Sequence, residues 1–345
     1  MAEGHSLQRL RDGLPYPLTH VHVSELREGQ SIGQCFLVRR KAQRVTRGGE
    51  PYLEIILADR SGSVSARAWA EATQRYASGF EEGDFVYVEG RSETYRNALQ
   101  IIVRSIRRLE LQEGETGSLP GFDPALLVPT TERDVEEMWA ELLELAGGID
   151  SEPLRRLTVS LLEDRAEDWK AYPAALFHHH ACLGGLLEHT LDVARFAALV
   201  AVQSDEVDRD LLLAGAILHD VGKLEEMENP VAPRFTFQGN LIGHLLLGRD
   251  AVREKGKQIE GLDERTLRLL EHIIISHHGE PEYGAARRPM TLESIALYYL
   301  DNLSAKLDEA GARIQRDNRA GEFTEWQQEP PGGSRLFKGS LNNGG

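Results

Sequence analysis

Cysteine is scarce in this chain. The 345 residues include only Cys35 and Cys182, which stand 147 positions apart. Two such distant thiols cannot form the dense disulfide framework of a small secreted domain. The cysteine content therefore excludes a disulfide scaffold and leads us to expect a reducing, cytoplasmic environment.

Long hydrophobic runs are also lacking. No apolar stretch approaches the roughly 18 to 20 residues of a membrane-spanning helix, and the N-terminal "MAEGHSLQRLRDG" has no apolar signal-peptide core. With 41% hydrophobic and 27% charged residues, the composition is typical of soluble globular proteins. We expect no membrane association, and the length allows two domains.

An excess of positive charge is the third absence. The formal net charge is −16, which argues against nucleic-acid binding over the whole surface. However, residues 18–110 hold 14 Lys and Arg against 12 Asp and Glu, whereas the remainder holds 25 against 43. The chain thus joins a near-neutral module to a strongly acidic one, which indicates a division of labour.

The near-neutral module has the pattern of β-structure. Residues 33–70 contain three strand-like runs, interrupted at Gly48-Gly49 and Ser61-Gly62, and residues 84–110 contain two more. A polar stretch of helical character, residues 71–77, lies between the third and fourth strands. Five strands with a helix in that position predict an OB-fold barrel over residues 18–110.

Basic and aromatic residues occur together in this module. The basic residues gather toward the first hairpin, and the aromatic residues lie on later strands. Charge for phosphates and flat rings for bases are what single-stranded nucleic acid requires. We interpret them as contacts to single-stranded RNA or DNA; the alternative is a solvated rim and core aromatics. The candidate contacts are Arg39, Arg40, Lys41, Arg44, Trp69 and Tyr95.

The second half of the chain is helical in pattern. Residues 111–130, rich in Gly, Pro and acidic residues, predict a linker. Apolar periodicity then predicts an all-α bundle over residues 131–325, followed by a low-complexity tail at 326–345. The expected helices cover 131–148, 153–168, 183–202, 209–220, 240–257, 263–277 and 291–313.

Histidine is concentrated in this helical half. Nine of the twelve histidines lie between positions 178 and 278, and several end or interrupt an apolar helical face. Buried carboxylates ringed by imidazoles, without obvious arginine partners, require a cation. The pattern therefore predicts a divalent-metal site. The candidate ligands are His189, His219, Asp220, His244, His277, His278 and Asp301.

Other histidines have weaker arguments. The "HHH" at 178–180 could be a solvated loop, a helix cap or a set of phosphate contacts, and we favour substrate contact for His179 and His180. His272, one turn before the His277-His278 pair, is expected to support the site or the fold. Mixed imidazole and carboxylate ligands favour Mn²⁺, Fe²⁺, Co²⁺, Ni²⁺ or Zn²⁺, with Mg²⁺ still open; we expect Mn²⁺.

The ordered series "HHHACLGGLLEHTLDVA", "HDVGK", "GHLLLG", "SHHGEPEYG" and "TLESIALYYLDNLSAKLD" resembles the HD superfamily of metal-dependent phosphohydrolases. Behind an OB-like module, it is similar to the YhaM-type 3′–5′ exoribonucleases. The resemblance covers nearly the whole chain. It implies a metal-dependent phosphodiesterase with an HD domain over residues 131–325.

The resemblance also implies how the residues divide. His189, His219 and Asp301 would hold one ion, His244, His277 and His278 a second, and Asp220 would bridge them. A metal-activated water would attack the terminal phosphodiester and release a nucleoside 5′-monophosphate. Asp220, His219 and Lys223 are the expected catalytic residues. Lys223 would offset charge on the phosphate or leaving oxygen, or would serve only as a helix C-terminal cation.

Two alternative functions remain open at this stage. One is a phosphohydrolase acting on free or cyclic nucleotides, with the OB module regulatory. The other is a single-strand-binding protein whose helical half is a metal-stabilised scaffold, although a structural metal needs only about four ligands. The sequence does not decide between RNA and DNA, between one ion and two, or between a monomer and a homo-oligomer.

Overall fold

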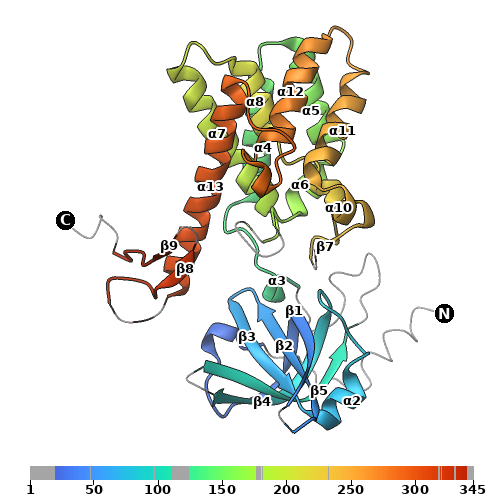
Figure 1. Cartoon of the computed structure of the whole chain (residues 1–345), viewed down its shortest axis with the longest axis vertical. Coiled ribbons are helices and arrows are strands. Elements are labelled where there is room, and N and C mark those ends of the chain that lie inside the picture. Colours follow the sequence, from blue (N-terminus) through green and yellow to red (C-terminus); the bar gives the residue numbers. More distant parts are fainter. Residues whose placement is uncertain are drawn as a thin grey trace, which may run out of the picture. The chain divides into compact units, whose positions relative to one another are not determined.

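The computed structural model describes most of the chain as two compact units (Figure 1). One unit holds the described residues up to Thr130 together with Asn229–Arg234, and the other holds the rest from Thr131 onward. The described residues are 20–46, 48–95, 98–109, 124–175, 180, 182–231, 233–317, 319, 321–329 and 332–339.

The first unit is a closed five-stranded barrel. Its strands follow the order β1-β2-β3-β5-β4, in which β3 and β5 are parallel and all other neighbours are antiparallel. Helix α2 lies between β3 and β4 in the chain, so the predicted OB-fold is confirmed. The elements are β1 (Ser31–Val45), β2 (Pro51–Asp59), β3 (Gly62–Ala68), α2 (Ala70–Tyr76), β4 (Phe85–Tyr95) and β5 (Ala98–Arg108).

Alternation of side chains along each strand fills the barrel. On β3, Val64, Ala66 and Ala68 are buried, whereas the residues between them are partly or fully exposed. Closure also needs a glycine in β4 at an irregularity of the register. A Cβ at Gly90 would lie 2.2 Å from the carbonyl oxygen of Ile102, so only glycine allows this approach.

The segment between the barrel and the helices is not wholly irregular. Helix α3 (Pro124–Leu127) packs on β1 and β2, and Arg60 donates its backbone N–H to the Leu126 carbonyl at 3.1 Å. Leu127 and Val128 are buried. The last part of the predicted linker therefore belongs to the barrel unit, while residues 110–123 lie outside the described residues.

The second unit is a helical bundle, as predicted. Two of the expected helices are each divided in two: Asp164 and Arg165 separate α5 from α6, and Gly243, with φ +79°, separates α10 from α11. Its helices are α4 (Val135–Gly147), α5 (Glu152–Glu163), α6 (Ala166–Ala171), α7 (Gly185–Gln203), α8 (Arg209–Leu218), α9 (Lys223–Glu226), α10 (Phe237–Leu241), α11 (His244–Gly256), α12 (Glu264–Ser276) and α13 (Leu292–Arg316).

Polar side chains fix where the principal helices begin. Asp208 accepts the Leu211 N–H at 3.0 Å at the start of α8, and Asp263 accepts the Thr266 N–H at 3.0 Å at the start of α12. Thr291 forms a capping box with Ser294 at the start of α13. Two of these helices, α8 and α12, have the candidate ligands His219 and His277 as their C-caps.

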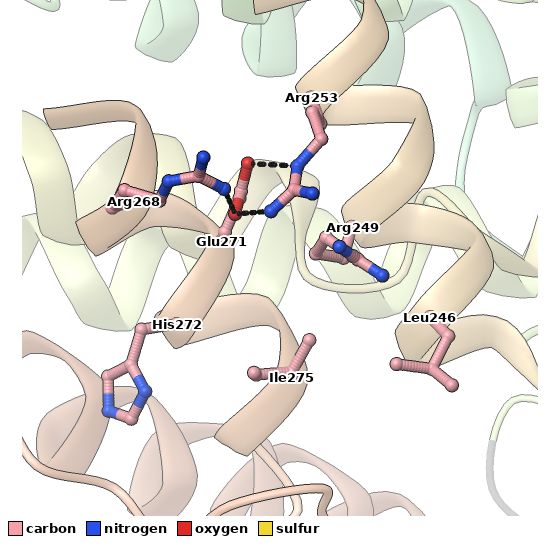
Figure 2. A pocket seen from close by; sticks show the side chains of 7 residues that line it. All are labelled: Leu246, Arg249, Arg253, Arg268, Glu271, His272 and Ile275. Atoms are coloured by element: carbon pink, nitrogen blue, oxygen red, sulfur yellow. Dashed lines mark hydrogen bonds and ion pairs between the residues drawn. The ribbon is translucent and has the colours of Figure 1, made fainter. Parts of the chain in front are cut away.

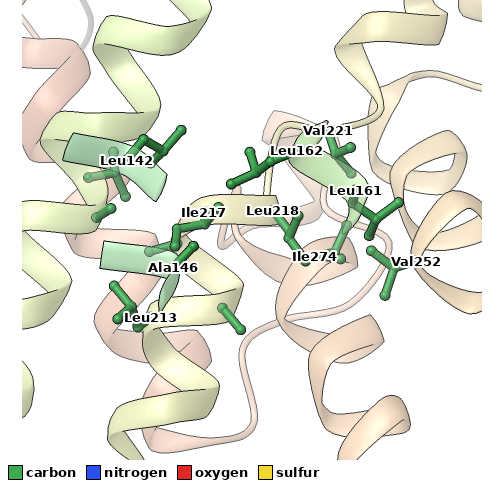
Figure 3. Close-up of a cluster of buried hydrophobic side chains, with 14 of the residues drawn as sticks. Leu142, Ala146, Leu161, Leu162, Leu213, Ile217, Leu218, Val221, Val252 and Ile274 are labelled. Carbon is green, nitrogen blue, oxygen red and sulfur yellow. The ribbon is translucent and has the colours of Figure 1, made fainter. Parts of the chain in front are cut away.

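One apolar core joins the helices. Figure 3 shows Leu142 of α4, Leu162 of α5, Ile217 of α8 and Ile274 of α12 converging on it, and each of these side chains is fully buried. Burying side chains of this size contributes about 1.5 to 3 kcal/mol each to folding. The core holds α8 between its neighbours, so the residues that follow α8 are rigidly placed.

Within the described part of the chain, no helix combines the length and apolarity needed to cross a membrane.

The predicted low-complexity tail contains a hairpin, β8 (Gln327–Glu329) and β9 (Gly332–Ser334), and a bridge joins Phe323 to Phe337. Beyond Gly339 the tail lies outside the described residues.

Candidate metal centre

Helix ends bring the predicted ligands together. His219 caps the C-terminus of α8 and Asp220 follows it, while His277 caps α12 and His278 follows that residue. His244 is the first residue of α11. His189, in the second turn of α7, and Asp301, near the middle of α13, supply the other two ligands. We call the seven side chains the histidine–aspartate cluster: His189, His219, Asp220, His244, His277, His278 and Asp301.

The cluster has two halves. In the first half, His189 Nε2 lies 3.2 Å from His219 Nε2 and 3.1 Å from Asp301 Oδ1, and His219 Nε2 lies 4.0 Å from that oxygen. In the second half, His244 Nε2 lies 3.3 Å from His278 Nε2. Nitrogen atoms of His244, His277 and His278 lie within 4.8 Å of one another. Each half offers three ligand atoms at the spacing of a metal shell.

Asp220 lies between the two halves. Its Oδ2 is 3.3 Å from His219 Nε2, and its Oδ1 is 3.6 Å from His244 Nε2 and 3.8 Å from His277 Nε2. Among the described residues, no hydrogen-bond donor reaches this Oδ1, although it is buried. A buried carboxylate oxygen without a donor is costly, so the residues present fit a divalent cation beside it.

The cluster also holds each imidazole in one orientation. The Nδ1–H groups of His219, His277 and His278 donate to backbone carbonyl oxygens at 2.8, 2.8 and 2.9 Å. His244 Nδ1 lies 3.0 Å from Glu226 Oε1, and His189 Nδ1 lies 3.1 Å from the Ser304 hydroxyl. All five Nε2 atoms therefore turn inward. In the four rings whose Nδ1 faces a carbonyl or carboxylate oxygen, the lone pair is left on Nε2, as metal-binding histidines require.

Burial decides the charge of three of the imidazoles. Desolvation lowers the pKa of His189 and His278 and lowers the pKa of His277 well below its usual value, so these rings are neutral near pH 7. Burial opposes charge on His219 too, but the adjacent Asp220 carboxylate outweighs it and raises the His219 pKa. Neutral imidazole is the form that binds a metal.

The two carboxylates stay ionised in spite of their burial. Desolvation would raise the pKa of Asp220, but Lys223 and His219 outweigh it and hold the pKa well below the usual value. His189 does the same for Asp301. The Lys223 ammonium lies 2.6 Å from Asp220 Oδ2, at the start of α9. Lys223 therefore touches the cluster and is not a cation at the end of α8.

A glycine permits this arrangement. A Cβ on Gly222 would lie 2.0 Å from the His244 carbonyl oxygen and 2.5 Å from the Gly248 nitrogen. The turn after Asp220 can therefore approach the first turn of α11 only because residue 222 has no side chain. This close approach brings Asp220 within reach of His244.

An ion-pair network ties α11 to α12. Figure 2 shows Arg253 and Arg268 converging on Glu271, with Arg253 donating two hydrogen bonds at 2.8 and 2.6 Å and Arg268 one at 2.9 Å. These residues line a cavity of about 270 Å³ together with His272. His272 Nε2 accepts the Met290 N–H at 3.0 Å, as expected of a structural residue. The network fixes His244 relative to His277.

Of the two histidines expected to contact substrate, the structure describes one. His180 is 7% exposed, and its ring centroid lies 5.4 Å from that of His189. Its backbone N–H donates to Asp308 at 2.8 Å, and its Nδ1 lies 3.7 Å from Glu188. His180 thus borders the histidine–aspartate cluster. His179 lies outside the described residues.

On the barrel, three partly exposed aromatic side chains lie on β2, at the end of β3 and at the end of β4. Trp69 and Tyr95 are 43% and 44% exposed. Trp69 packs against Tyr52 with ring centroids 5.4 Å apart, and the Arg67 guanidinium lies 5.1 Å from the Tyr95 ring centroid. Arg67 and Trp69, two positions apart, point to the same side. We call Tyr52, Arg67, Trp69 and Tyr95 the aromatic face.

The basic residues predicted on β1 differ from one another. Arg40 is exposed, and Arg44 is exposed with its Nε 3.4 Å from Glu54. Arg39 is half-buried and has interactions of its own. Lys41 donates to the Phe80 carbonyl and to Glu81, and its ammonium lies over the Phe80 ring. Lys41 is therefore engaged within the barrel.

Three supporting residues were not predicted from the sequence. Glu226 contacts His244 and Ser304 contacts His189, and both stand far from their partners in the chain. The available signal was that each lies in or beside a motif that also holds a candidate ligand or Lys223. Arg67 sits in "GSVSARAWA", where strand alternation with Trp69 was the available signal. Tyr87 is 1% exposed and lies on the opposite face of β4 from the core residues Val86 and Val88, with the Arg107 guanidinium 5.7 Å from its ring centroid.

Comparison with known proteins agrees with both units. Residues 37–109 match the model of the OB-fold nucleic acid binding domain, and residues 186–306 match that of the HD domain. The fold and the histidine–aspartate cluster thus define an HD-domain protein with an N-terminal OB-fold.

Curated relatives narrow this class. The chain is 30% identical to the 3′-5′ exoribonuclease YhaM of Bacillus subtilis over 297 residues, which cover 86% of this chain and 91% of the relative. It is 31% identical to YhaM of Bacillus velezensis with the same coverage. For YhaM of Listeria monocytogenes the identity is 30%, with 86% and 92% covered. The chain belongs to the YhaM family of 3′-5′ exoribonucleases.

Proposed function

We propose that this protein is a metal-dependent 3′–5′ exonuclease that hydrolyses single-stranded RNA to nucleoside 5′-monophosphates. The observation that carries the proposal is the convergence of seven side chains from five helix ends and helix faces on two adjoining groups of ligand atoms. The relatives bearing this pair of domains are named 3′-5′ exoribonucleases. A single-strand-binding scaffold would not need seven ligands.

We assign the cluster to two divalent ions, with Mn²⁺ as the preferred metal. His189, His219 and Asp301 would hold one ion and His244, His277 and His278 the other, with Asp220 shared between them. Such ions, when bound, lower the pKa of a water molecule and stabilise charge on phosphate oxygens. Asp220 Oδ1, which has no hydrogen-bond donor among the described residues, supports the shared position.

The chain's own residues prepare the site for phosphodiester hydrolysis. The Nδ1 partners keep five imidazoles oriented, and Asp220 and Asp301 remain ionised. Lys223, now paired with Asp220, is close enough to exchange that carboxylate for a substrate phosphate oxygen. His180, which borders the cluster, would contact the same phosphate, and we assign the same role to His179.

The aromatic face would hold the single strand. Trp69 and Tyr95 are each more than 40% exposed, and bases would stack on their rings, while Arg67, Arg40 and Arg44 would supply positive charge. In an OB-fold, strands 2 and 3 and the flanking hairpin loops are the usual binding surface. Tyr52 and Trp69 lie at the ends of those two strands.

The test uses purified full-length chain with Mn²⁺ and 5′-end-labelled RNA and DNA, single-stranded and duplex, beside a panel of free and cyclic nucleotides. We expect a ladder that shortens from the 3′ end on single-stranded RNA, with nucleoside 5′-monophosphates released. Asp220→Asn should abolish the ladder, whereas Asp250→Asn, which changes an exposed aspartate of α11, should not. Turnover of free nucleotides without any ladder would contradict the proposal.

A further inference from the structure

A second group of potential metal ligands lies in the barrel unit, apart from the histidine–aspartate cluster. His20 and His22 precede the short 3₁₀ helix Val23–Glu25, and Asp59 ends β2. Their ligand atoms lie within 4.8 Å of one another. The Asp59 side chain is fully buried, and the His20 and His22 side chains are 11% and 26% exposed.

Hydrogen bonds hold the Asp59 carboxylate in one orientation. Its Oδ1 accepts the Ser61 N–H at 2.7 Å and the Ser61 hydroxyl at 2.6 Å, and its Oδ2 accepts the Val23 N–H at 2.7 Å. One side of Oδ2 remains, and it faces both imidazoles. His20 Nε2 lies 2.9 Å from this oxygen.

His22 does not complete a hydrogen bond with this carboxylate. Its Nδ1 is buried, lies 3.5 Å from Asp59 Oδ2, and has no hydrogen-bond partner within the described part of the chain. Burying a ring nitrogen without a hydrogen-bond partner costs folding free energy. Two ligand atoms bound to one ion at about 2.0 to 2.1 Å are separated by roughly 3.3 Å in tetrahedral geometry, and 3.5 Å is close to that separation.

We propose that His20 Nε2, His22 Nδ1 and Asp59 Oδ2 bind one divalent cation of the Zn²⁺ class, with water completing the shell. Two imidazoles and one carboxylate are ligands that Zn²⁺, Co²⁺ and Ni²⁺ favour. The ion would tie the segment before β1 to the end of β2. Its role would be structural. The three hydrogen bonds that Asp59 accepts from Val23 and Ser61 already join the same segments, and the ion would strengthen that connection.

The experiment counts metal ions in full-length chain that has been stripped with chelator, reloaded with Zn²⁺ and desalted. We expect His22→Ala to bind one Zn²⁺ fewer per chain than the unchanged protein, and His20→Ala to show the same loss. His272→Ala serves as the control and should bind the unchanged number, because His272 Nε2 only accepts a backbone N–H. Exoribonuclease activity with Mn²⁺ should be preserved in His22→Ala.

A second measurement separates this site from the histidine–aspartate cluster. Asp220→Asn should retain the Zn²⁺ equivalent that His22→Ala loses. The visible absorption of Co²⁺-loaded Asp220→Asn should fall by the contribution of one ion in the double variant with His22→Ala. Circular dichroism verifies that each variant is folded, and His22→Gln replaces any that is not. An unchanged Zn²⁺ count in folded His22→Ala or His22→Gln overturns the proposal, whatever the nuclease assay shows.

Discussion

The histidine–aspartate cluster and the aromatic face are built in opposite ways. His189, His219 and His277 are at most 1% exposed and each has its second ring nitrogen held. Trp69 and Tyr95 are more than 40% exposed; Trp69 packs against Tyr52, and the Arg67 guanidinium lies over the Tyr95 ring. Hydrolysis requires fixed groups at one point, whereas gripping a strand of any sequence requires faces that adapt to each base.

The contrast between a rigid cluster and an exposed aromatic face predicts that a change in the cluster causes the largest loss of hydrolytic rate. Asp220→Asn should reduce the rate of RNA hydrolysis by about 10³-fold or more, because it removes charge shared by both halves of the cluster. Affinity for single-stranded RNA should persist, since the aromatic face is unchanged. Steady-state hydrolysis and fluorescence anisotropy measure the two effects. Equal losses in hydrolysis and RNA affinity would contradict the division of labour.

A residue that only positions a ligand should have a smaller effect. Glu226→Gln weakens the contact that orients His244, and changes of this kind typically cost about 10- to 100-fold in metal affinity or activity. Higher Mn²⁺ concentration should restore most of the lost activity. Glu225→Gln, the neighbouring change, should have little effect. If added Mn²⁺ fails to rescue Glu226→Gln, the residue does not act through His244.

Changes in the aromatic face should act on substrate binding alone. Trp69→Ala should raise KM for long single-stranded RNA by about 10-fold, because a stacked base contributes roughly 1 to 3 kcal/mol. The value of kcat, and KM for a dinucleotide, should remain unchanged. Trp69→Phe, which keeps a ring, should restore most of the affinity. A Trp69→Ala protein with the same KM on long RNA would remove Trp69 from the binding surface.

The smallest expected effect is a low reactivity of the two cysteine thiols, one in each unit. Burial raises the pKa of both Cys35 and Cys182 to about 12, so the reactive thiolate is rare near pH 8 and becomes more abundant as the pH rises. Both thiols should react with iodoacetamide far more slowly in the native protein than after denaturation. Mass spectrometry at several times gives the rate for each unit. Rapid native labelling at pH 8 would show that the thiol is not buried.

Much of this architecture could be predicted from the sequence. Alternation on the strands predicted the barrel. Five histidines and two aspartates that end or interrupt apolar helical runs were the seven candidate ligands, and the structure brings them together. The helix break at Arg165 was not predicted, because arginine is a good helix former and gives no local signal. The break at Gly243 was also missed, although glycine disfavours a helix interior and was the available signal. Partners such as Glu226 and Ser304 depend on which helices pack together, which local patterns do not encode.

The His20, His22 and Asp59 group shows the same limit. His20 and His22 alone gave no argument in the sequence, since their third partner lies at the end of β2, 37 residues or more along the chain. Only closure of the barrel brings the three together. Single histidines become informative when the fold supplies the carboxylate.

The most direct test is X-ray diffraction from crystals of the full-length chain grown with Mn²⁺, recorded at the manganese absorption edge. We predict anomalous peaks at the histidine–aspartate cluster, one beside His189, His219 and Asp301 and one beside His244, His277 and His278, with Asp220 contacting both. An absence of anomalous signal there in crystals of active enzyme would contradict the account.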